Sequence, residues 1–258
     1  MKMVLMQLDI AFGEPEKNIR HAEKLMRETL REKTDVMILP ELWTTGYDLK
    51  NLDHTADAEG EKIKKIAGAW ARNMNANVIA GSIAQKTESG IFNTLFVFNR
   101  EGTRIKEYSK AHLFRLMNEE KFLEAGKQDG LFMIDDIPAA GFVCYDIRFP
   151  EWIRKHVLSG ARLLFIPAEW PKPRLDHWRT LLTCRAIENQ AYVIACNRAG
   201  SDPDNVFAGH SMVISPWGEI LAEAGEEETV LTVDIDLSAV DTIRSRIPIF
   251  EDRRPELY

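Results

Sequence analysis

The sequence predicts an α/β protein whose helices cover a mixed β-sheet. Two observations carry this prediction. Short aliphatic and β-branched runs alternate along the chain with longer amphipathic stretches of helical period. Turn residues also separate neighbouring strand-like runs, which predicts hairpins and therefore antiparallel strands beside the parallel ones. No repeat, low-complexity tract or linker interrupts the 258 residues, so one domain over residues 1–258 is expected.

The first half of the chain alternates in this way from its start. Strands are expected at residues 4–8, 36–39, 78–84, 94–98 and 103–108. Helices are expected at residues 15–32 and 63–74. The first of these helices rests on apolar positions that recur at helical spacing, namely Ile19, Ala22, Leu25, Met26 and Leu30.

The second half begins with one more strand and helix pair and then becomes rich in strands. Strands are expected at residues 141–144, 163–167, 192–196, 211–215, 219–222 and 229–235. Helices are expected at residues 176–189 and from Pro150 onward, because proline suits the first turn of a helix. Gly218 supplies the turn of a hairpin in the segment SPWGEI.

Composition excludes several classes of function. The net charge is −7 and no basic stripe is present, so nucleic acid is not an expected partner. The N-terminal apolar stretch reaches Asp9 too soon for a signal peptide, and no apolar run approaches the roughly 18 residues of a membrane span. Three cysteines argue against a disulfide framework. A cytoplasmic protein with reduced thiols, and without a membrane partner, is expected.

Cys144 is the candidate nucleophile. It ends an apolar strand and precedes a turn and a helix, where unpaired N–H groups favour a thiolate and hold an oxyanion. The alternative is a small apolar residue that closes a core strand. Cys184 and Cys196 are expected to be packing residues. The six histidines have neither a cysteine-protease context nor a zinc spacing, so the general base for Cys144 must be another residue.

Three segments of the sequence resemble a known family, and this resemblance identifies a general base. LPELWTTGYD around Glu41, YSKAHLF around Lys110 and CYDIRFPEW around Cys144, in this order, resemble the carbon–nitrogen hydrolase (nitrilase) superfamily. The resemblance extends to QLDIAFGEPEKN, PAEWPKPRLDHW, RAIENQAYVIACN and FAGHSMVISPWGE, and so covers nearly the whole chain. Taken alone, Glu41 would be a helix or turn acid at the end of a strand and Lys110 a surface charge, because most such side chains are solvated.

The resemblance implies a fold and a mechanism. The fold is a four-layer α-β-β-α sandwich. Glu41 would be the general base, Cys144 the nucleophile, and Lys110, with the N–H of Tyr145, the group that stabilises the oxyanion. Neither a cofactor nor a metal is implied.

The family also has a second glutamate between the lysine and the cysteine. The stretch NEEKFLEAG offers Glu119, Glu120 and Glu124, and the Leu and Gly that follow favour Glu119; the alternative is a run of solvated acids. Members of the family usually pair through helices. The helix at 176–189 is the candidate for that face, with Trp178, Leu181, Leu182 and Ile187 on it, so a homodimer or a higher homo-oligomer is expected.

The sequence around these residues looks most like that of the omega-amidase branch of the family. Members of this branch release ammonia from the terminal amide of 2-oxo acids such as 2-oxoglutaramate. The expected partner is therefore a small amide that carries a carboxylate. Arg148 would bind that carboxylate, the alternative being a surface ion pair with Glu151 or Asp146. Four aromatic residues are expected to line the pocket or else to belong to the core: Trp43, Tyr47, Phe114 and Trp170.

Other functions remain open at this point. A nitrilase and an N-carbamoyl amine hydrolase would use the same catalytic residues, although Arg148 would repel a cationic carbamoyl substrate. A catalytically silent scaffold or binding protein is a further alternative, and the intact set of Glu41, Lys110 and Cys144 argues against it. A phosphate-binding enzyme is disfavoured because no glycine-rich loop precedes a helix.

Overall fold

Two β-sheets packed face to face form the centre of the protein, which is described here by a computed structural model covering residues 1–29 and 33–257. The first sheet has the strand order β13-β1-β2-β4-β5-β6, with β3 beside β4. Its strands are β1 (Lys2–Gln7), β2 (Val36–Ile38), β3 (Asp57–Ala58), β4 (Asn77–Thr87), β5 (Gly90–Phe98), β6 (Arg104–Ser109) and β13 (Thr229–Asp234).

The second sheet has the order β12-β11-β10-β9-β8-β7. Its strands are β7 (Leu131–Ile134), β8 (Ile137–Gly141), β9 (Leu163–Ala168), β10 (Tyr192–Asn197), β11 (Met212–Ile214) and β12 (Ile220–Glu223). Both sheets are mixed. In the first, β1 pairs in parallel with β2 and antiparallel with β13. In the second, β10 pairs in parallel with β9 and antiparallel with β11. The mixed pairing confirms the sequence prediction.

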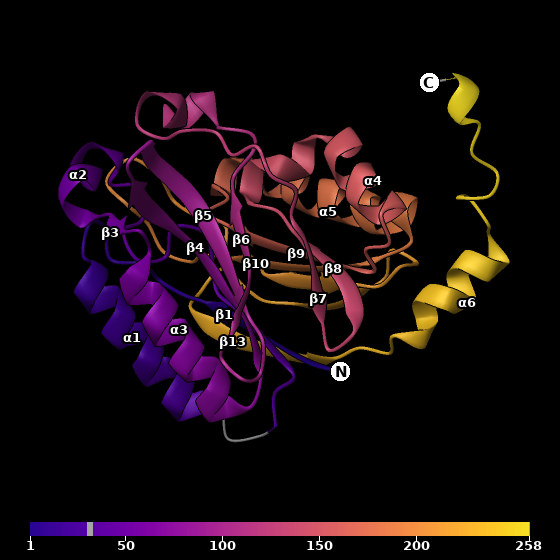
Figure 1. Ribbon diagram of the computed structural model, residues 1–258, viewed down its shortest axis with the longest axis horizontal. Helices are drawn as coiled ribbons and strands as arrows, with labels where there is room; N and C mark the ends of the chain where they lie inside the picture. Colours follow the sequence, from indigo (N-terminus) through magenta and orange to yellow (C-terminus); the bar gives the residue numbers. More distant parts are fainter. Residues whose placement is uncertain (30–32, 258) are drawn as a thin grey trace.

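Helices cover the outer face of each sheet. The longer helices are α1 (Pro15–Thr29), α3 (Glu61–Met74), α4 (Pro150–Leu158), α5 (Leu175–Asn189) and α6 (Ser238–Arg246), and α2 (Leu52–Thr55) is a single turn. Figure 1 shows α1 and α3 on one side of the paired sheets and α4 and α5 on the other. The four-layer α-β-β-α sandwich is therefore confirmed. Among the described residues, no helix has the length and apolar character needed to cross a bilayer.

The alternation of side chains along β1 explains why the layers form. Met3 and Leu5 belong to the core between the sheets, whereas Val4 and Met6 belong to the core beneath α1 and α3. Successive side chains of a strand point to opposite faces, so a run of apolar residues supplies both cores at once. All four side chains are at most 1% exposed.

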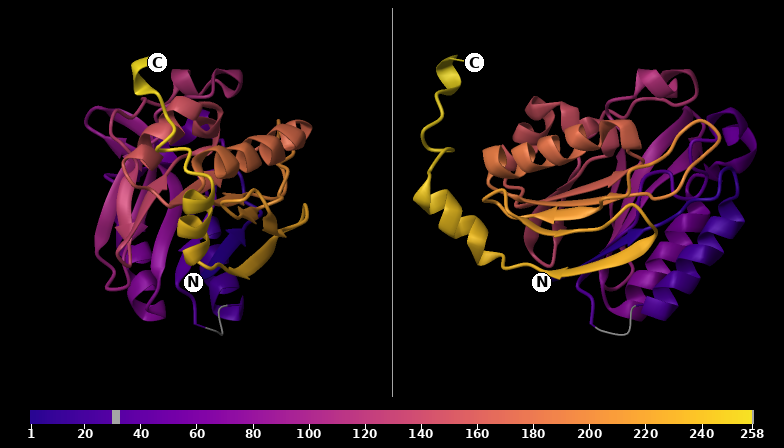
Figure 2. Two further views of the ribbon diagram at one scale, coloured as in Figure 1. Left: turned by 90° about the vertical axis from the view of Figure 1, so that its right-hand side faces the viewer. Right: turned by 180° about the vertical axis from the view of Figure 1, so that it is seen from behind.

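The structure corrects several predicted elements. Strand β8 ends at Gly141, so the strand expected at 141–144 stops before Cys144, which instead begins the 3₁₀ turn η4 (Cys144–Arg148). The β7–β8 hairpin and α6 were not predicted. Figure 2 shows that α6 and the segment after it leave the sandwich. The expected end of the first helix at residue 32 lies outside the described residues.

Candidate active site

Glu41 follows β2 in a loop that is held tightly against β4. The backbone of Gly81 makes this possible: it has a φ of +59°, and a Cβ at this position would lie 2.1 Å from the carbonyl oxygen of Pro40. Glu41 is 0% exposed. Its Oε1 accepts a hydrogen bond from Asn93 Nδ2 at 2.8 Å, and its Oε2 accepts one from the N–H of Glu169 at 2.9 Å. The carboxylate is therefore held by two segments that lie far from it in the sequence.

Lys110 comes directly after β6 and brings two carboxylates together. Its Nζ lies 2.8 Å from Glu41 Oε1 and 2.7 Å from Glu119 Oε1, and all three side chains are 0% exposed. Burial opposes a charge at this position, but the carboxylates of Glu119 and Glu41 outweigh it and raise the pKa of Lys110. The side chain is consequently a fixed ammonium.

Glu119 is the buried acid of its segment. It also accepts hydrogen bonds from the hydroxyl of Tyr47 at 2.5 Å and from the N–H of Phe114 at 2.8 Å. Burial raises the pKa of Glu119, against the charge of Lys110. Glu120 and Glu124 are exposed. The structure therefore brings Glu119 into the site and leaves the two other candidate acids outside it.

Cys144 lies at a strained turn between β8 and α4. Its φ of +44° is in the left-handed region, which is uncommon for a residue other than glycine and which often marks a functional turn. Burial first, and the charge of Glu41 next, raise the pKa of the Cys144 thiol well above its ordinary value, against the charge of Lys110. The sequence analysis expected a thiolate here, but the surroundings of Cys144 favour the protonated thiol. The thiol keeps its proton until a base removes it.

Asp146, which the sequence analysis treated only as a possible partner of Arg148, holds this turn. It is 0% exposed, and its carboxylate accepts hydrogen bonds from the N–H of Val143 at 2.9 Å and the hydroxyl of Tyr108 at 2.8 Å. The N–H of His112 donates at 3.1 Å, and the His112 ring lies 2.7 Å away. The sequence contained a signal for this role. Aspartate side chains commonly accept hydrogen bonds from nearby backbone N–H groups in turns, and Asp146 comes two residues after Cys144.

A small pocket opens beside Cys144. It is lined by Phe114, Cys144, Tyr145, Arg148, Glu169, Trp170, Pro171 and Arg174. Its volume is about 10 Å³, the room of roughly one water molecule. A substrate of several heavy atoms therefore requires the half-buried side chains at the rim to move.

Two guanidinium groups lie at this rim. Arg148 lies over the ring of Trp170, 4.8 Å from its centroid, and Arg174 lies over the ring of Phe114 at 5.4 Å. Within the part of the chain that the structure describes, no carboxylate forms a salt bridge with Arg148, so the alternative ion pair with Glu151 or Asp146 is not observed. Arg174 was not singled out in the sequence, although the motif PKPRLDHW contains it.

The predicted aromatic residues do not all line the pocket. Phe114 and Trp170 do. Tyr47 instead directs its hydroxyl at Glu119. Trp43 does not line the pocket but belongs to the core, as the alternative interpretation had it. It is 0% exposed under α1 and α3, where its indole N–H donates to the carbonyl oxygen of Ala80 at 2.8 Å. An indole that satisfies its N–H in the core has no polar group left for a ligand.

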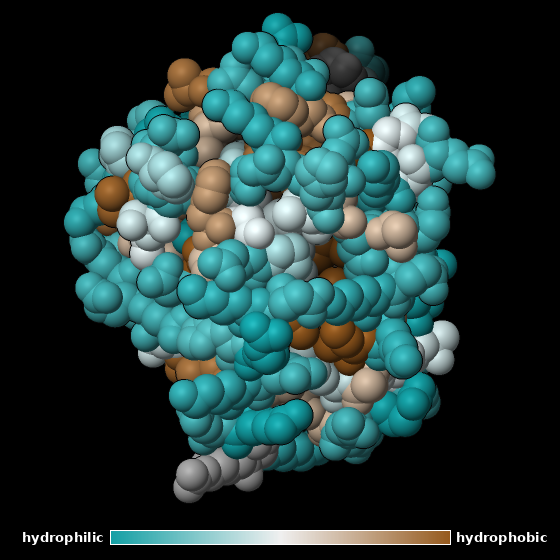
Figure 3. All heavy atoms as spheres, turned by 90° about the vertical axis from the view of Figure 1, so that its left-hand side faces the viewer, coloured by the Kyte–Doolittle hydropathy of each residue, from teal (hydrophilic) through white to brown (hydrophobic). Residues whose placement is uncertain are grey.

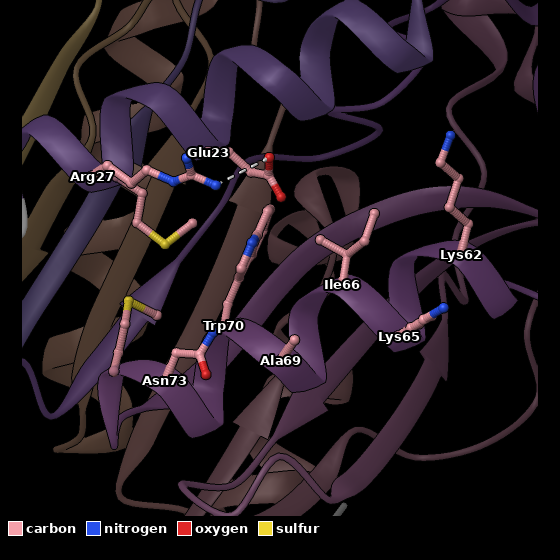
Figure 4. A pocket seen from close by; sticks show the side chains of 10 residues that line it. Glu23, Arg27, Lys62, Lys65, Ile66, Ala69, Trp70 and Asn73 are labelled. Carbon is pink, nitrogen blue, oxygen red and sulfur yellow. Dashed lines mark ion pairs between the residues drawn. The ribbon is translucent and has the colours of Figure 1, made fainter.

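A larger hollow of about 640 Å³ lies between α1 and α3, on the other side of the sandwich from α4 and α5. Figure 3 shows that this face is largely hydrophilic, with apolar atoms at the floor of a depression. Figure 4 shows Glu23 and Arg27 of α1 opposite Trp70 and Ile66 of α3. None of the candidate catalytic residues lines this hollow.

Known proteins resemble this chain over almost its whole length. The family model described as Carbon-nitrogen hydrolase matches residues 4–245. The 2-oxoglutaramate amidase of Bacillus subtilis is 51% identical over 98% of this chain and 97% of its own. The omega-amidase YafV of Escherichia coli K12 is 35% identical over 98% and 96%.

A solved structure also has a fold similar to that of this chain. A carbon–nitrogen hydrolase superfamily protein of Xanthomonas campestris, with an arsenic adduct in its active site, superimposes with a TM-score of 0.92 at 31% identity, over 98% of this chain and 97% of that one. The sandwich, the buried cluster around Cys144 and these relatives lead to one conclusion: the chain belongs to the carbon–nitrogen hydrolase family and is a hydrolase of carbon–nitrogen bonds.

Proposed function

We propose that the protein releases ammonia from the terminal amide of a small 2-oxo acid, a substrate like 2-oxoglutaramate, through a thioester on Cys144. The observation that carries the proposal is the contact of Lys110 with both Glu41 and Glu119 beside a buried, protonated thiol. The name of the Bacillus subtilis relative, 2-oxoglutaramate amidase, supports the choice of substrate.

In the first half of the reaction, Glu41 removes the proton of Cys144 and the sulfur attacks the amide carbon. The negative charge that develops on the carbonyl oxygen is stabilised by the ammonium of Lys110 and the N–H of Tyr145. Glu41 then returns the proton to the nitrogen, the carbon–nitrogen bond breaks, and ammonia leaves. The acyl group remains on the sulfur as a thioester.

In the second half, a water molecule attacks the thioester carbon and Glu41 accepts its proton. Collapse of the intermediate releases the carboxylic acid, and the proton returns to the sulfur. Glu119 keeps the Lys110 ammonium in place through the contact at 2.7 Å. Since Lys110 stays protonated throughout, it needs no proton transfer to act.

The guanidinium groups of Arg148 and Arg174 supply the recognition of a carboxylate. Two cations at the rim favour an anionic amide and repel the cationic substrates of many carbamoyl amine hydrolases. We expect Arg148→Ala to raise KM for an amide that carries a carboxylate far more than KM for a neutral amide of the same length. Equal effects on both substrates would remove Arg148 from substrate binding.

The test is ammonia release from 2-oxoglutaramate by the wild-type protein and by Cys144→Ala. Glutamine, a simple nitrile and a carbamoyl amine serve as control substrates. We expect release from the oxo-amide that is absent in the variant. Comparable turnover of the nitrile would favour a nitrilase instead, and the absence of turnover on every substrate would favour a silent scaffold.

We also propose that two copies of the chain pair through the outer face of α4 and α5. Trp178 and Leu182 of α5 are 0% exposed and pack inside their own protomer, so they are not available for this face, whereas Ile187 is 51% exposed. Other large apolar side chains that are exposed include Leu158, Trp217, Ile220 and Ile247, and the turn at Gly218, next to Trp217, lies against Ile187. Exposed apolar side chains that gather on one face are typical of an interface.

We place the protein in the cytoplasm. All three cysteines are free, and the proposed reaction requires a reduced thiol at Cys144.

A further inference from the structure

Glu169 is a buried acid that the mechanism above does not use. It follows β9, is 0% exposed, and lines the same pocket as Cys144. Its Oε2 lies 3.2 Å from Nη1 of Arg198, a guanidinium that is itself 0% exposed. Its Oε1 is buried without a hydrogen-bond partner in the part of the chain that the structure describes.

An unpaired buried carboxyl oxygen is costly, and such groups are uncommon in folded proteins. When one lies in a pocket beside a nucleophile, a ligand is the partner that satisfies it. The rest of Glu169 is held rigidly, since its N–H donates to Glu41 and its Oε2 contacts Arg198. Oε1 is therefore a fixed, unpaired polar atom of a residue that lines the pocket beside Cys144.

The charge balance decides which hydrogen bond this oxygen can make. Three buried carboxyl groups, those of Glu41, Glu119 and Glu169, are accompanied by two buried cations, Lys110 and Arg198. One carboxyl group therefore tends to keep its proton.

The pKa values of the cluster agree with this balance. Burial raises the pKa of Glu169 to about 8, with Arg198 opposing the increase and Glu41 and Asp202 adding to it. At neutral pH the Glu169 carboxyl is mostly neutral, and a neutral carboxyl can donate a hydrogen bond.

We propose that Glu169 determines specificity by donating a hydrogen bond from its carboxyl group to an oxygen on the acyl chain of the substrate, which selects a 2-oxo acid amide over the same amide without the oxo group. This inference rests on the proposed function for the choice of amide. An ionised carboxylate would repel a carbonyl oxygen, whereas a neutral acid attracts it. Arg148 and Arg174 at the same rim bind the adjacent carboxylate.

The test compares kcat/KM for 2-oxoglutaramate and for glutaramate, which lacks only the oxo group. In Glu169→Gln the amide can still accept from Arg198 and still donate into the pocket, so the preference for the oxo-amide is retained. In Glu169→Ala the donor is lost, and we expect the preference to fall roughly 10- to 100-fold, mainly through KM. The matched control is Glu120→Gln, an exposed acid, in which the preference is unchanged.

The dependence on pH gives a second measurement. In the wild-type protein the preference for the oxo-amide declines as the pH rises through about 8, because the donor proton is lost. In Glu169→Gln it is independent of pH in this range. A Gln variant as poor as the Ala variant, or the same preference in all variants, would overturn the inference.

Binding of the product acids, 2-oxoglutarate and glutarate, distinguishes a failure of the proposed function from a failure of the proposed role of Glu169. If the wild-type protein hydrolyses neither amide, the proposed function fails. Calorimetry with 2-oxoglutarate and glutarate then tests Glu169 alone. Tighter binding of the oxo acid that disappears in Glu169→Ala upholds the role of Glu169, and equal binding of both acids, or binding of neither, rejects it.

Discussion

Lys110 supplies the buried cation that offsets two carboxyl groups of the candidate active site. Its ammonium lies between Glu41 and Glu119, and all three groups are fully buried. Lys110→Met leaves two buried carboxylates close together without a cation. We expect a loss of about 3–5 kcal/mol in the free energy of unfolding, together with the loss of ammonia release.

Denaturation in urea measures the loss of stability. The control is Lys121→Met, because Lys121 is an exposed cation two residues from Glu119, and its change should stay within about 0.5 kcal/mol. If Lys110→Met were as stable as this control, the ammonium of Lys110 would not be needed to offset the two buried carboxyl groups.

The raised pKa of Glu169 predicts how the free energy of unfolding changes with pH. A carboxyl group whose pKa is raised from 4.5 to about 8 on folding stabilises the protein fully below pH 4.5, and this contribution is lost as the pH rises toward 8. Relative to Glu169→Gln, the wild-type protein should therefore lose stability between pH 5 and pH 8. Urea denaturation of both proteins at the two pH values measures the difference. A constant difference would show that Glu169 has the same protonation state in the folded and unfolded chains.

At this scale the motifs around Glu41, Lys110 and Cys144 could be recognised in the sequence, and Glu119 could be selected by its position relative to Leu123 and Gly126. Glu169 could not be predicted. An acid is normally solvated, and its burial depends on Arg198, which lies 29 residues further along the chain and reaches it only through the pairing of β9 with β10.

Among the elements, helix α5 has two faces with different partners. Trp178 and Leu182 pack into the core, and Cys184 and Ile187 are exposed. The exposed Cys184 corrects the expectation that it is a packing residue. One face of α5 therefore packs on the core, and the other leaves Ile187 exposed for the interface that we propose.

We expect Ile187→Glu to dissociate the proposed dimer, because a charge would be buried without a partner. Sedimentation velocity measures the change in mass. In the dimer, Cys184 should be protected from a maleimide reagent, and the substitution should expose it. Leu116→Glu, which changes an apolar residue that is 70% exposed and lies on a different segment, should alter neither measurement. A wild-type protein that sediments as a monomer would contradict the proposal.

The strands were predicted better than the turns between them. Continuous apolar runs marked β1, β2, β9 and β10 because these strands are buried on both faces. The β7–β8 hairpin turns through Asp135 and Asp136, both of which have a positive φ. Because neither is glycine, the sequence contains no strong signal for this turn. Helix α6 was missed since Val240 is its only buried side chain among the described residues.

The whole molecule depends on the core between the two sheets. Leu5 lies on β1, between β13 and β2 in the first sheet, and is 0% exposed in this core. We expect Leu5→Ala to cost about 2–5 kcal/mol, because it leaves a cavity that both sheets enclose. Leu116→Ala, at an exposed position, should cost less than about 0.5 kcal/mol.

Unfolding in urea, followed by tryptophan fluorescence and by circular dichroism, measures this effect. The six tryptophans include Trp43 in the core under α1 and α3 and Trp178 in the core between the sheets, so fluorescence samples both cores. Coincident transitions in fluorescence and circular dichroism would indicate that the layers unfold together. Two separate transitions for Leu5→Ala would show that the sheets are independent.

The left-handed backbone at Cys144 limits which residues can ever act there. A second heavy atom on Cβ is poorly tolerated at a φ of +44°, so threonine is sterically excluded, whereas serine has the same shape as cysteine. The turn therefore admits only one other hydroxyl-bearing nucleophile among the small side chains. Substitution by serine is therefore the short route by which this chain could exchange the proposed thioester intermediate for an oxygen ester.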